Sequence, residues 1–258
     1  MGLLDFNSNF NVSIPKVKLP KISFGKKPCE TSPVQEEDSY SKNSSTAKYF
    51  DESSVKTMVG SNPKVTSILA RYGLTPTINL TELKKLAMNH LNDTKDIALG
   101  IYNKLPEDIR TSIIKINLID AAMLHDFGKV LIPNEILNKN SSLNPEEKEV
   151  MQLHSELGYE LLQTQDINPE TLKLIKYHHQ NPNNTGYPKI QDLYEHNLAA
   201  DVLHAADVYS ALRENRCYKK SLSPEQALSV LRQEVQAGNL DGKVYSALEN
   251  YVTRPSES

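Results

Sequence analysis

The sequence contains three strongly marked helix starts, and they limit the fold more than any other feature. In each, a side chain that accepts hydrogen bonds stands directly before a proline. The three pairs are Asn144-Pro145, Asn168-Pro169 and Ser223-Pro224. The acceptor caps free N–H groups of the first helical turn, where proline loses no hydrogen bond. These starts predict helices over about 145–165, 169–179 and 224–236.

Helical signals dominate from about residue 57 onward, and no convincing run of strands appears, so the expected fold class is all-α. A further helix is expected over residues 109–124, because its apolar residues lie on more than one face. They are Ile113, Ile114, Ile116, Leu118, Ile119, Ala122 and Met123. Such a helix is buried on most sides and carries His125 and Asp126 at its C-terminal end.

Residues 1–56 form the other expected part of the chain, a disordered or loosely docked tail in front of a helical domain over 57–258. They are rich in Ser, Asn, Lys and Pro, so little apolar burial offsets the entropy that ordering removes. Within them, residues 12–24 alternate apolar side chains with lysines. This segment is part of the loose tail, an extended peptide that adds to the sheet edge of a partner, or a peripheral contact with an anionic membrane surface.

Composition excludes several classes of function. The formal net charge of −3 gives no basic field, which argues against general nucleic-acid binding. Cys29 and Cys217 are too few for a disulfide framework and fit a reducing compartment. No apolar stretch approaches the roughly 20 residues that span a bilayer, and the start MGLLDF lacks a basic leader region. We therefore expect a cytoplasmic protein without a transmembrane segment.

The His-Asp pair is followed by a lysine in the spacing H-D-x-x-K, at His125, Asp126 and Lys129. If the helix continues that far, one turn brings the lysine next to the pair. Imidazole and carboxylate are ligands of first-row divalent metals, and a nearby lysine can neutralise phosphate oxygens. Taken alone, these residues are also consistent with a helix C-terminus at which His and Lys face the negative end of the helix dipole.

Four more residues extend the set of candidate metal ligands. His178 and His179 are adjacent, and because neighbouring side chains on a helix diverge by about 100°, they cannot both face one ordinary core. At a helix end, however, they can serve neighbouring metals. His154 lies among apolar residues of the 145–165 helix and has the alternative role of a hydrogen-bonded core histidine. Asp207 falls in the apolar stretch LAADVLHAADVYSAL, where a buried carboxylate is costly without a cation.

In this order the residues resemble the HD-GYP branch of the HD phosphohydrolase superfamily, over about residues 85–252. The motifs are AAMLHDFGKVLIPNEIL, LNPEEKEVMQLHSELGYELL, YHHQNPNNTGYP, and ADVYSAL followed by Arg216 and Tyr218. The resemblance implies an HD-type helical bundle with divalent metal ions, iron or manganese in preference to zinc, cobalt or nickel. It also implies that the bacterial second messenger cyclic di-GMP, a cyclic dinucleotide, is hydrolysed by water that two such ions activate.

The resemblance also implies a role for each site residue. The implied metal ligands are His90, His125, Asp126, His154, His178, His179 and Asp207. Asp126 is expected to bridge the ions, and Lys129 to meet a substrate phosphate. His90 lies upstream in a poorly matched stretch and has the alternative role of an ordinary surface histidine. Members with three metals carry a glutamate where this chain has Leu86, so two ions are expected.

The chain departs from the family pattern in the signature loop H-H-E-x-x-D-G-x-G-Y-P, which here reads HHQNPNNTGYP over residues 178–188. Two acids and one glycine are missing. Gly186, Tyr187 and Pro188 remain as implied substrate-binding residues, and Tyr187 and Pro188 have the alternative role of fixing the turn. Gly186 is expected to supply backbone angles that are closed to other residues.

Two further departures lie near the end of the domain. Asp201 stands where members often carry arginine, and Ser210 where they often carry a second aspartate. Loss of positive charge near a phosphate site weakens the binding of a dianionic dinucleotide. An alternative therefore stays open, in which the chain is a catalytically degenerate regulatory module. Such a module binds a cyclic dinucleotide, or a signalling protein such as a diguanylate cyclase, without turnover.

Overall fold

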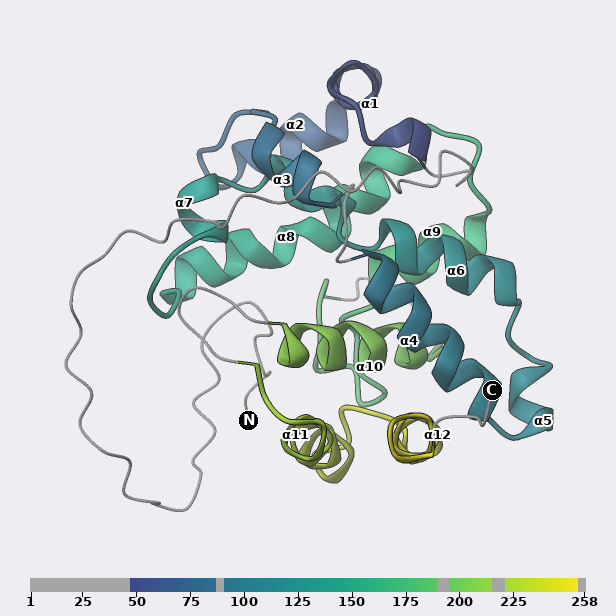
Figure 1. Cartoon of the computed structure of the whole chain (residues 1–258). Coiled ribbons are helices and arrows are strands. Elements are labelled where there is room, and N and C mark those ends of the chain that lie inside the picture. The colour runs from purple at the N-terminus through teal and green to yellow at the C-terminus, as the bar shows by residue number, and fades with distance from the viewer. Residues whose placement is uncertain (1–46, 87–90, 190–194, 215–220, 255–258) are drawn as a thin grey trace, which may run out of the picture.

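A computed structural model describes residues 47–86, 91–189, 195–214 and 221–254, and within these ranges the fold is all-α, without strands (Figure 1). The helices are η1 (Ala47–Tyr49), α1 (Glu52–Ser61), α2 (Pro63–Ala70), α3 (Leu80–Lys85), α4 (Leu91–Lys104), α5 (Glu107–Arg110), α6 (Lys115–Leu124), η3 (Phe127–Leu131), α7 (Asn134–Leu137), α8 (Pro145–Leu162), α9 (Pro169–Tyr177), α10 (Leu198–Arg213), α11 (Pro224–Gln236) and α12 (Gly242–Thr253). The expected fold class is confirmed.

The three starts marked by proline are helix starts in the structure. Asn144, Asn168 and Ser223 each accept a hydrogen bond from a backbone N–H of the first turn that follows. In α8 and α11 the third helical residue also reaches back to the cap, which completes a capping box. Helices α8, α9 and α11 end at residues 162, 177 and 236, against predicted ends of 165, 179 and 236.

Helix α10 lies at the centre of the domain. Every residue from Ala199 to Leu212 is buried. Helices α4, α11 and α12 pack against α10, and α6 and α9 contact it as well. In Figure 1, α11 and α12 lie on one side of α10, with α8 and α1 to α3 on the other. A polar side chain on such a helix faces only other protein groups or a bound ligand, so the polar residues of α10 need partners.

The turn η3 lies directly against α8, and a glycine allows this close approach. A Cβ atom on Gly128 would lie 2.0 Å from the carbonyl oxygen of His154 and 2.5 Å from the backbone nitrogen of Gly158. Backbone atoms of α8 cannot move aside without moving His154. The contact therefore fixes the position of η3 relative to a predicted metal ligand.

The predicted helix over 109–124 is wrong in its first part. Helix α5 ends at residue 110 and α6 begins only at residue 115, with Ile114 in an extended conformation between them. Ile114 and Ile116 are 60% and 58% exposed. A run of isoleucines indicates apolar character, but it does not tell which faces the rest of the chain covers. The second part is confirmed, since α6 ends at Leu124 and places His125 and Asp126 in the core.

The helical part begins earlier than the expected boundary at residue 57. Helix α1 starts at residue 52 with Asp51 as its cap, and Tyr49 and Val55 belong to the hydrophobic core. After α1, the side-chain nitrogen of Asn62 donates to the backbone oxygen and to the carboxylate of Glu160 in α8, at 2.8 and 2.9 Å. The last ten residues of the expected tail, 47–56, are therefore docked on the domain.

Several predictions fall outside the described residues. They concern residues 1–46 with the segment 12–24, Cys29, His90, Arg216, Cys217 and Tyr218. Within the described ranges, none of the helices combines the length and the apolar character that a membrane crossing requires.

Candidate metal centre

The structure brings six of the predicted metal ligands into two adjacent groups. One group is His154, His178 and His179, and the other is His125, Asp126 and Asp207. All six residues are buried, and within each group one ligand atom per residue lies within 4.8 Å of the others. The groups adjoin at Asp126, whose Oδ1 lies 3.6 Å from Nε2 of His154 and whose Oδ2 lies 3.5 Å from Nε2 of His125.

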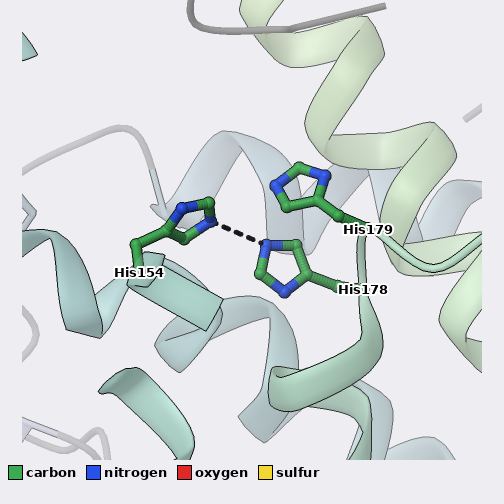
Figure 2. Close-up of side chains that lie close together, drawn as sticks. All are labelled: His154, His178 and His179. Carbon is green, nitrogen blue, oxygen red and sulfur yellow. Dashed lines mark hydrogen bonds between the residues drawn. The ribbon is translucent and has the colours of Figure 1, made fainter. Parts of the chain in front are cut away.

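Four helices position these ligands. His125 and Asp126 follow the last turn of α6, His154 lies within α8, His178 and His179 follow α9, and Asp207 lies within α10. Figure 2 shows His154 and the histidine pair approaching one another from α8 and from the end of α9. The site thus exists only when helices distant in the sequence are packed together.

Three of the imidazoles are oriented by the same backbone contact. Nδ1 of His125, His154 and His178 lies 2.9, 2.8 and 2.7 Å from the carbonyl oxygen of the residue three positions earlier. A carbonyl oxygen only accepts hydrogen bonds, so Nδ1 carries a proton in each ring. Hydrogen bonding at one ring nitrogen while the other points into a site is the arrangement found in metal-binding histidines.

The Nε2 atoms of His154 and His178 face each other at 3.3 Å, where Figure 2 draws a hydrogen bond that would require a proton on one of the two Nε2 atoms. Burial lowers the pKa of His154 to about 4 and the pKa of His178 well below its ordinary value. Both rings are therefore neutral at pH 7, and since each carries its proton on Nδ1, two lone pairs point at each other. A divalent cation that binds both lone pairs removes this repulsion.

His125 and Asp207 form the other side of the centre, with 3.4 Å between Nε2 and Oδ1. Burial lowers the pKa of His125, but Asp126 and Asp207 raise this pKa by more, so that it lies above its ordinary value. Burial raises the pKa of Asp207, but the hydrogen bond and the charge of His125 outweigh burial, so that this pKa is lowered. The buried carboxylate is thus ionised, and a metal ion bound here would take the place of the proton that His125 shares with it.

Lys129 reaches the site through the 3-10 turn η3 and not through a continued α6. Its Nζ lies 2.6 Å from Oδ2 of Asp126. Burial lowers the pKa of Lys129, but the carboxylates of Asp126 and Asp207 raise it by more, so the side chain remains an ammonium ion. The predicted proximity of the lysine to the pair is confirmed, and its contact with a substrate phosphate stays a prediction.

Gln180 organises the altered signature loop, a role that the sequence analysis missed. Its Oε1 accepts from the backbone N–H of Gly186 at 2.8 Å, and its Nε2 donates to the carbonyl oxygen of Pro188 at 2.9 Å. The ring of Tyr187 lies against that of His179, with 4.6 Å between centroids. An amide thus holds the loop against the histidine pair at the position where the family pattern has an acid.

The expected reason for Gly186 is wrong. This residue does not have a positive φ, and the left-handed residue of the loop is Asn184, at φ 60°. Glycine is needed at 186 because a Cβ atom there would lie 2.1 Å from the carbonyl oxygen of His179. Asn184 takes the place of the missing glycine of the pattern, and asparagine tolerates left-handed angles better than most residues.

Asp201 has its own partners within the fold. One of its oxygens lies 3.0 Å from Nε2 of His196, and the other accepts from the backbone N–H of Asp241 at 3.1 Å. The hydrogen bond to Asp201 raises the pKa of His196 above its ordinary value. The negative charge at position 201 is therefore compensated locally.

An all-α domain in which buried helices present two adjacent His/Asp groups belongs to the class of helical metal-binding domains. A family model described as "HD domain" matches residues 79–244, and the chain belongs to this family.

Named relatives support the assignment. The 3'3'-cGAMP-specific phosphodiesterase 1 of Vibrio cholerae is 31% identical over 126 residues, which cover 49% of this chain and 29% of that protein. The cyclic di-GMP phosphodiesterase response regulator RpfG of Xanthomonas campestris is 35% identical over 129 residues, covering 48% and 34%. The cyclic di-GMP phosphodiesterase of Thermotoga maritima is 31% identical over 149 residues, covering 57% and 39%.

The matched segments thus span between 29% and 39% of these relatives. Among solved structures, Bd1817, a HDG"Y"P protein from Bdellovibrio bacteriovorus, matches with a TM-score of 0.51 and 16% identity, over 79% of this chain and 66% of that one. This likeness concerns the fold. Together with the family match, the relatives confirm the resemblance found in the sequence.

Proposed function

We propose that the chain is a metal-dependent phosphodiesterase that hydrolyses cyclic di-GMP. The main support is the pair of facing Nε2 lone pairs of His154 and His178, since a buried site of this kind is stabilised by a cation. The relatives named as phosphodiesterases of cyclic dinucleotides support the substrate class. Imidazole and carboxylate ligands suit first-row divalent ions in general, and among these iron or manganese is proposed because of the resemblance to the HD-GYP branch.

The two ligand groups suggest which residues of this chain would hold each ion. His154, His178 and His179 would hold one ion, and His125 and Asp207 a second, with Asp126 shared because one of its oxygens faces each group. When bound, two divalent ions lower the pKa of water and neutralise negative charge on a phosphate group.

The remaining site residues would act on the substrate directly. Lys129 keeps its positive charge and would stabilise the charge that accumulates on the phosphoryl oxygens during hydrolysis. Gly186, Tyr187 and Pro188 are partly exposed on the loop held by Gln180. They would contact the dinucleotide next to the histidine pair.

Turnover by the wild type and by Asp126→Ala tests the proposal. Both proteins are loaded anaerobically with Mn²⁺ or Fe²⁺ and incubated with cyclic di-GMP or with 3',3'-cGAMP, and the nucleotides are resolved chromatographically. Metal ions supply several kcal/mol of transition-state stabilisation, so the variant should lose at least about 100-fold in rate. Asp96→Ala is the matched control, because this carboxylate of α4 is 65% exposed, and its rate should be unchanged.

Equal rates for the wild type and Asp126→Ala would contradict catalysis at this centre. The regulatory alternative makes a different prediction, namely that the wild type binds a cyclic dinucleotide and releases no product. Equilibrium dialysis with the same nucleotides separates the two outcomes.

A further inference from the structure

His204 is a buried histidine of α10 that belongs to neither ligand group. It is 4% exposed, and its Nδ1 lies 3.0 Å from the carbonyl oxygen of His178. Its ring stands nearly perpendicular to that of His179, with 5.9 Å between centroids. His204 therefore contacts both members of the histidine pair without being one of the predicted metal ligands.

The carbonyl groups of the pair need partners because α9 ends there. The carbonyl groups in the last turn of a helix accept no hydrogen bond from within that helix. The carbonyl oxygen of His178 accepts from Nδ1–H of His204, and that of His179 accepts from the backbone N–H of Tyr187 at 3.1 Å. Each hydrogen bond fixes the orientation of a peptide group, and with it the direction in which the imidazoles leave the backbone.

Helix α10 connects the pair to the other ligand group. His204 and Asp207 are three positions apart, so they lie on one face of α10. Asp207 lies 3.4 Å from His125, while His204 contacts the end of α9. Since α10 is buried along its length, both contacts are made from a helix that is held on all sides.

We propose, on the basis of the metal centre proposed above, that His204 is a positioning residue of that centre. By donating Nδ1–H to the carbonyl oxygen of His178, it holds the peptide so that the rings of His178 and His179 face His154. Groups that orient metal ligands in this way change metal affinity by roughly 10- to 100-fold when they are removed. His204 thus contributes to metal affinity without touching the metal or the substrate.

Mn²⁺ affinity of the full-length protein tests this role. After chelation, free Mn²⁺ is measured by EPR during titration of the wild type, His204→Leu, His204→Asn and His204→Gln, and thermal unfolding of each metal-free protein is recorded. Asn places its amide nitrogen near the position of Nδ1, whereas Gln extends one bond further. His196→Asn is the matched control, since this histidine is exposed and pairs with Asp201, away from the ligand groups.

We expect His204→Leu to bind Mn²⁺ at least about 10-fold more weakly, His204→Asn to recover most of the affinity, and His196→Asn to match the wild type. If His204→Leu does not fold, tighter binding by His204→Asn than by His204→Gln, at equal unfolding midpoints, decides in favour of the proposal. Wild-type affinity in His204→Leu, or equal affinities of the Asn and Gln variants, would overturn it. A wild type that binds no Mn²⁺ would overturn the metal centre itself and this role with it.

Discussion

The side chain of Gln180 both donates and accepts, and this distinguishes it from the glutamate of the family pattern. It accepts from Gly186 and donates to the carbonyl oxygen of Pro188. In Gln180→Glu, an ionised carboxylate would keep the first contact but oppose a carbonyl oxygen at the second. A buried acceptor without a donor costs about 1–3 kcal/mol. We therefore expect a loss of unfolding free energy of that size, measured by urea denaturation, although the substitution restores the family residue.

The same substitution at an exposed position provides the control. Gln233 is exposed on α11, so Gln233→Glu should change the unfolding free energy by less than about 0.5 kcal/mol. Hydrogen exchange at the backbone N–H of Tyr187, which donates to the carbonyl oxygen of His179, should be faster in Gln180→Glu than in the control, because the loop loses its contact at Pro188. Unchanged exchange and unchanged stability would show that the loop does not depend on the amide.

At the scale of elements, the contact between η3 and α8 depends on a single glycine. In Gly128→Ala the new Cβ atom would collide with backbone atoms of His154 and Gly158. Overpacking against backbone costs about 3 kcal/mol or more, and relief by movement of α8 displaces His154. We expect both a lower unfolding free energy and weaker Mn²⁺ binding. Gly60→Ala in α1 is the control, because nothing lies within 4 Å of its Cβ position; there alanine should leave the protein equally or more stable.

Helix starts were predictable from the sequence because a cap is a local interaction. Asn144, Asn168 and Ser223 each accept from a backbone N–H two or three residues away, so the packing of the rest of the chain has little effect on where these helices begin. The break between α5 and α6 was not predictable, because the exposure of Ile114 and Ile116 depends on which other helices pack there.

The candidate site, like the fold, was predictable from the sequence only in part. Residue types that bind metals identify the candidate ligands, and the position of Asp207 in an apolar helix already indicated a cationic partner. The role of Gln180 depends on a contact eight residues away along the loop, with Pro188, and that of His204 on a contact 26 residues away. Such contacts have no periodic signal in the sequence, although His204 lies one turn before Asp207 on the same face.

At the scale of the whole molecule, burial of neutral histidines makes the metal-free protein sensitive to acid. Burial lowers the pKa values of His154, His178 and His179, whereas unfolded histidines take up protons near pH 6.5. Below that pH the unfolded state binds more protons than the folded state, so the unfolding free energy falls as the pH falls. For His154, with a folded pKa of about 4, the loss approaches about 3 kcal/mol at pH 4. The raised pKa of His125 acts in the opposite direction and offsets part of this loss.

Urea denaturation in the presence of a chelator, between about pH 7 and pH 4.5, measures this effect. The unfolding free energy should decrease through this range, and the slope should be smaller by up to one proton in His154→Leu, because leucine takes up none. Saturating Mn²⁺ should raise stability by mass action and steepen the dependence on pH, since protons compete with the ion for the same imidazoles. A flat profile for the metal-free wild type would mean that the three histidines are already protonated, or solvated, in the folded protein. Neutral histidines whose lone pairs face one another require the unfolding free energy to fall as the pH falls. A steeper fall in the presence of Mn²⁺ would link this acid sensitivity to the ligand groups that α6, α8, α9 and α10 bring together.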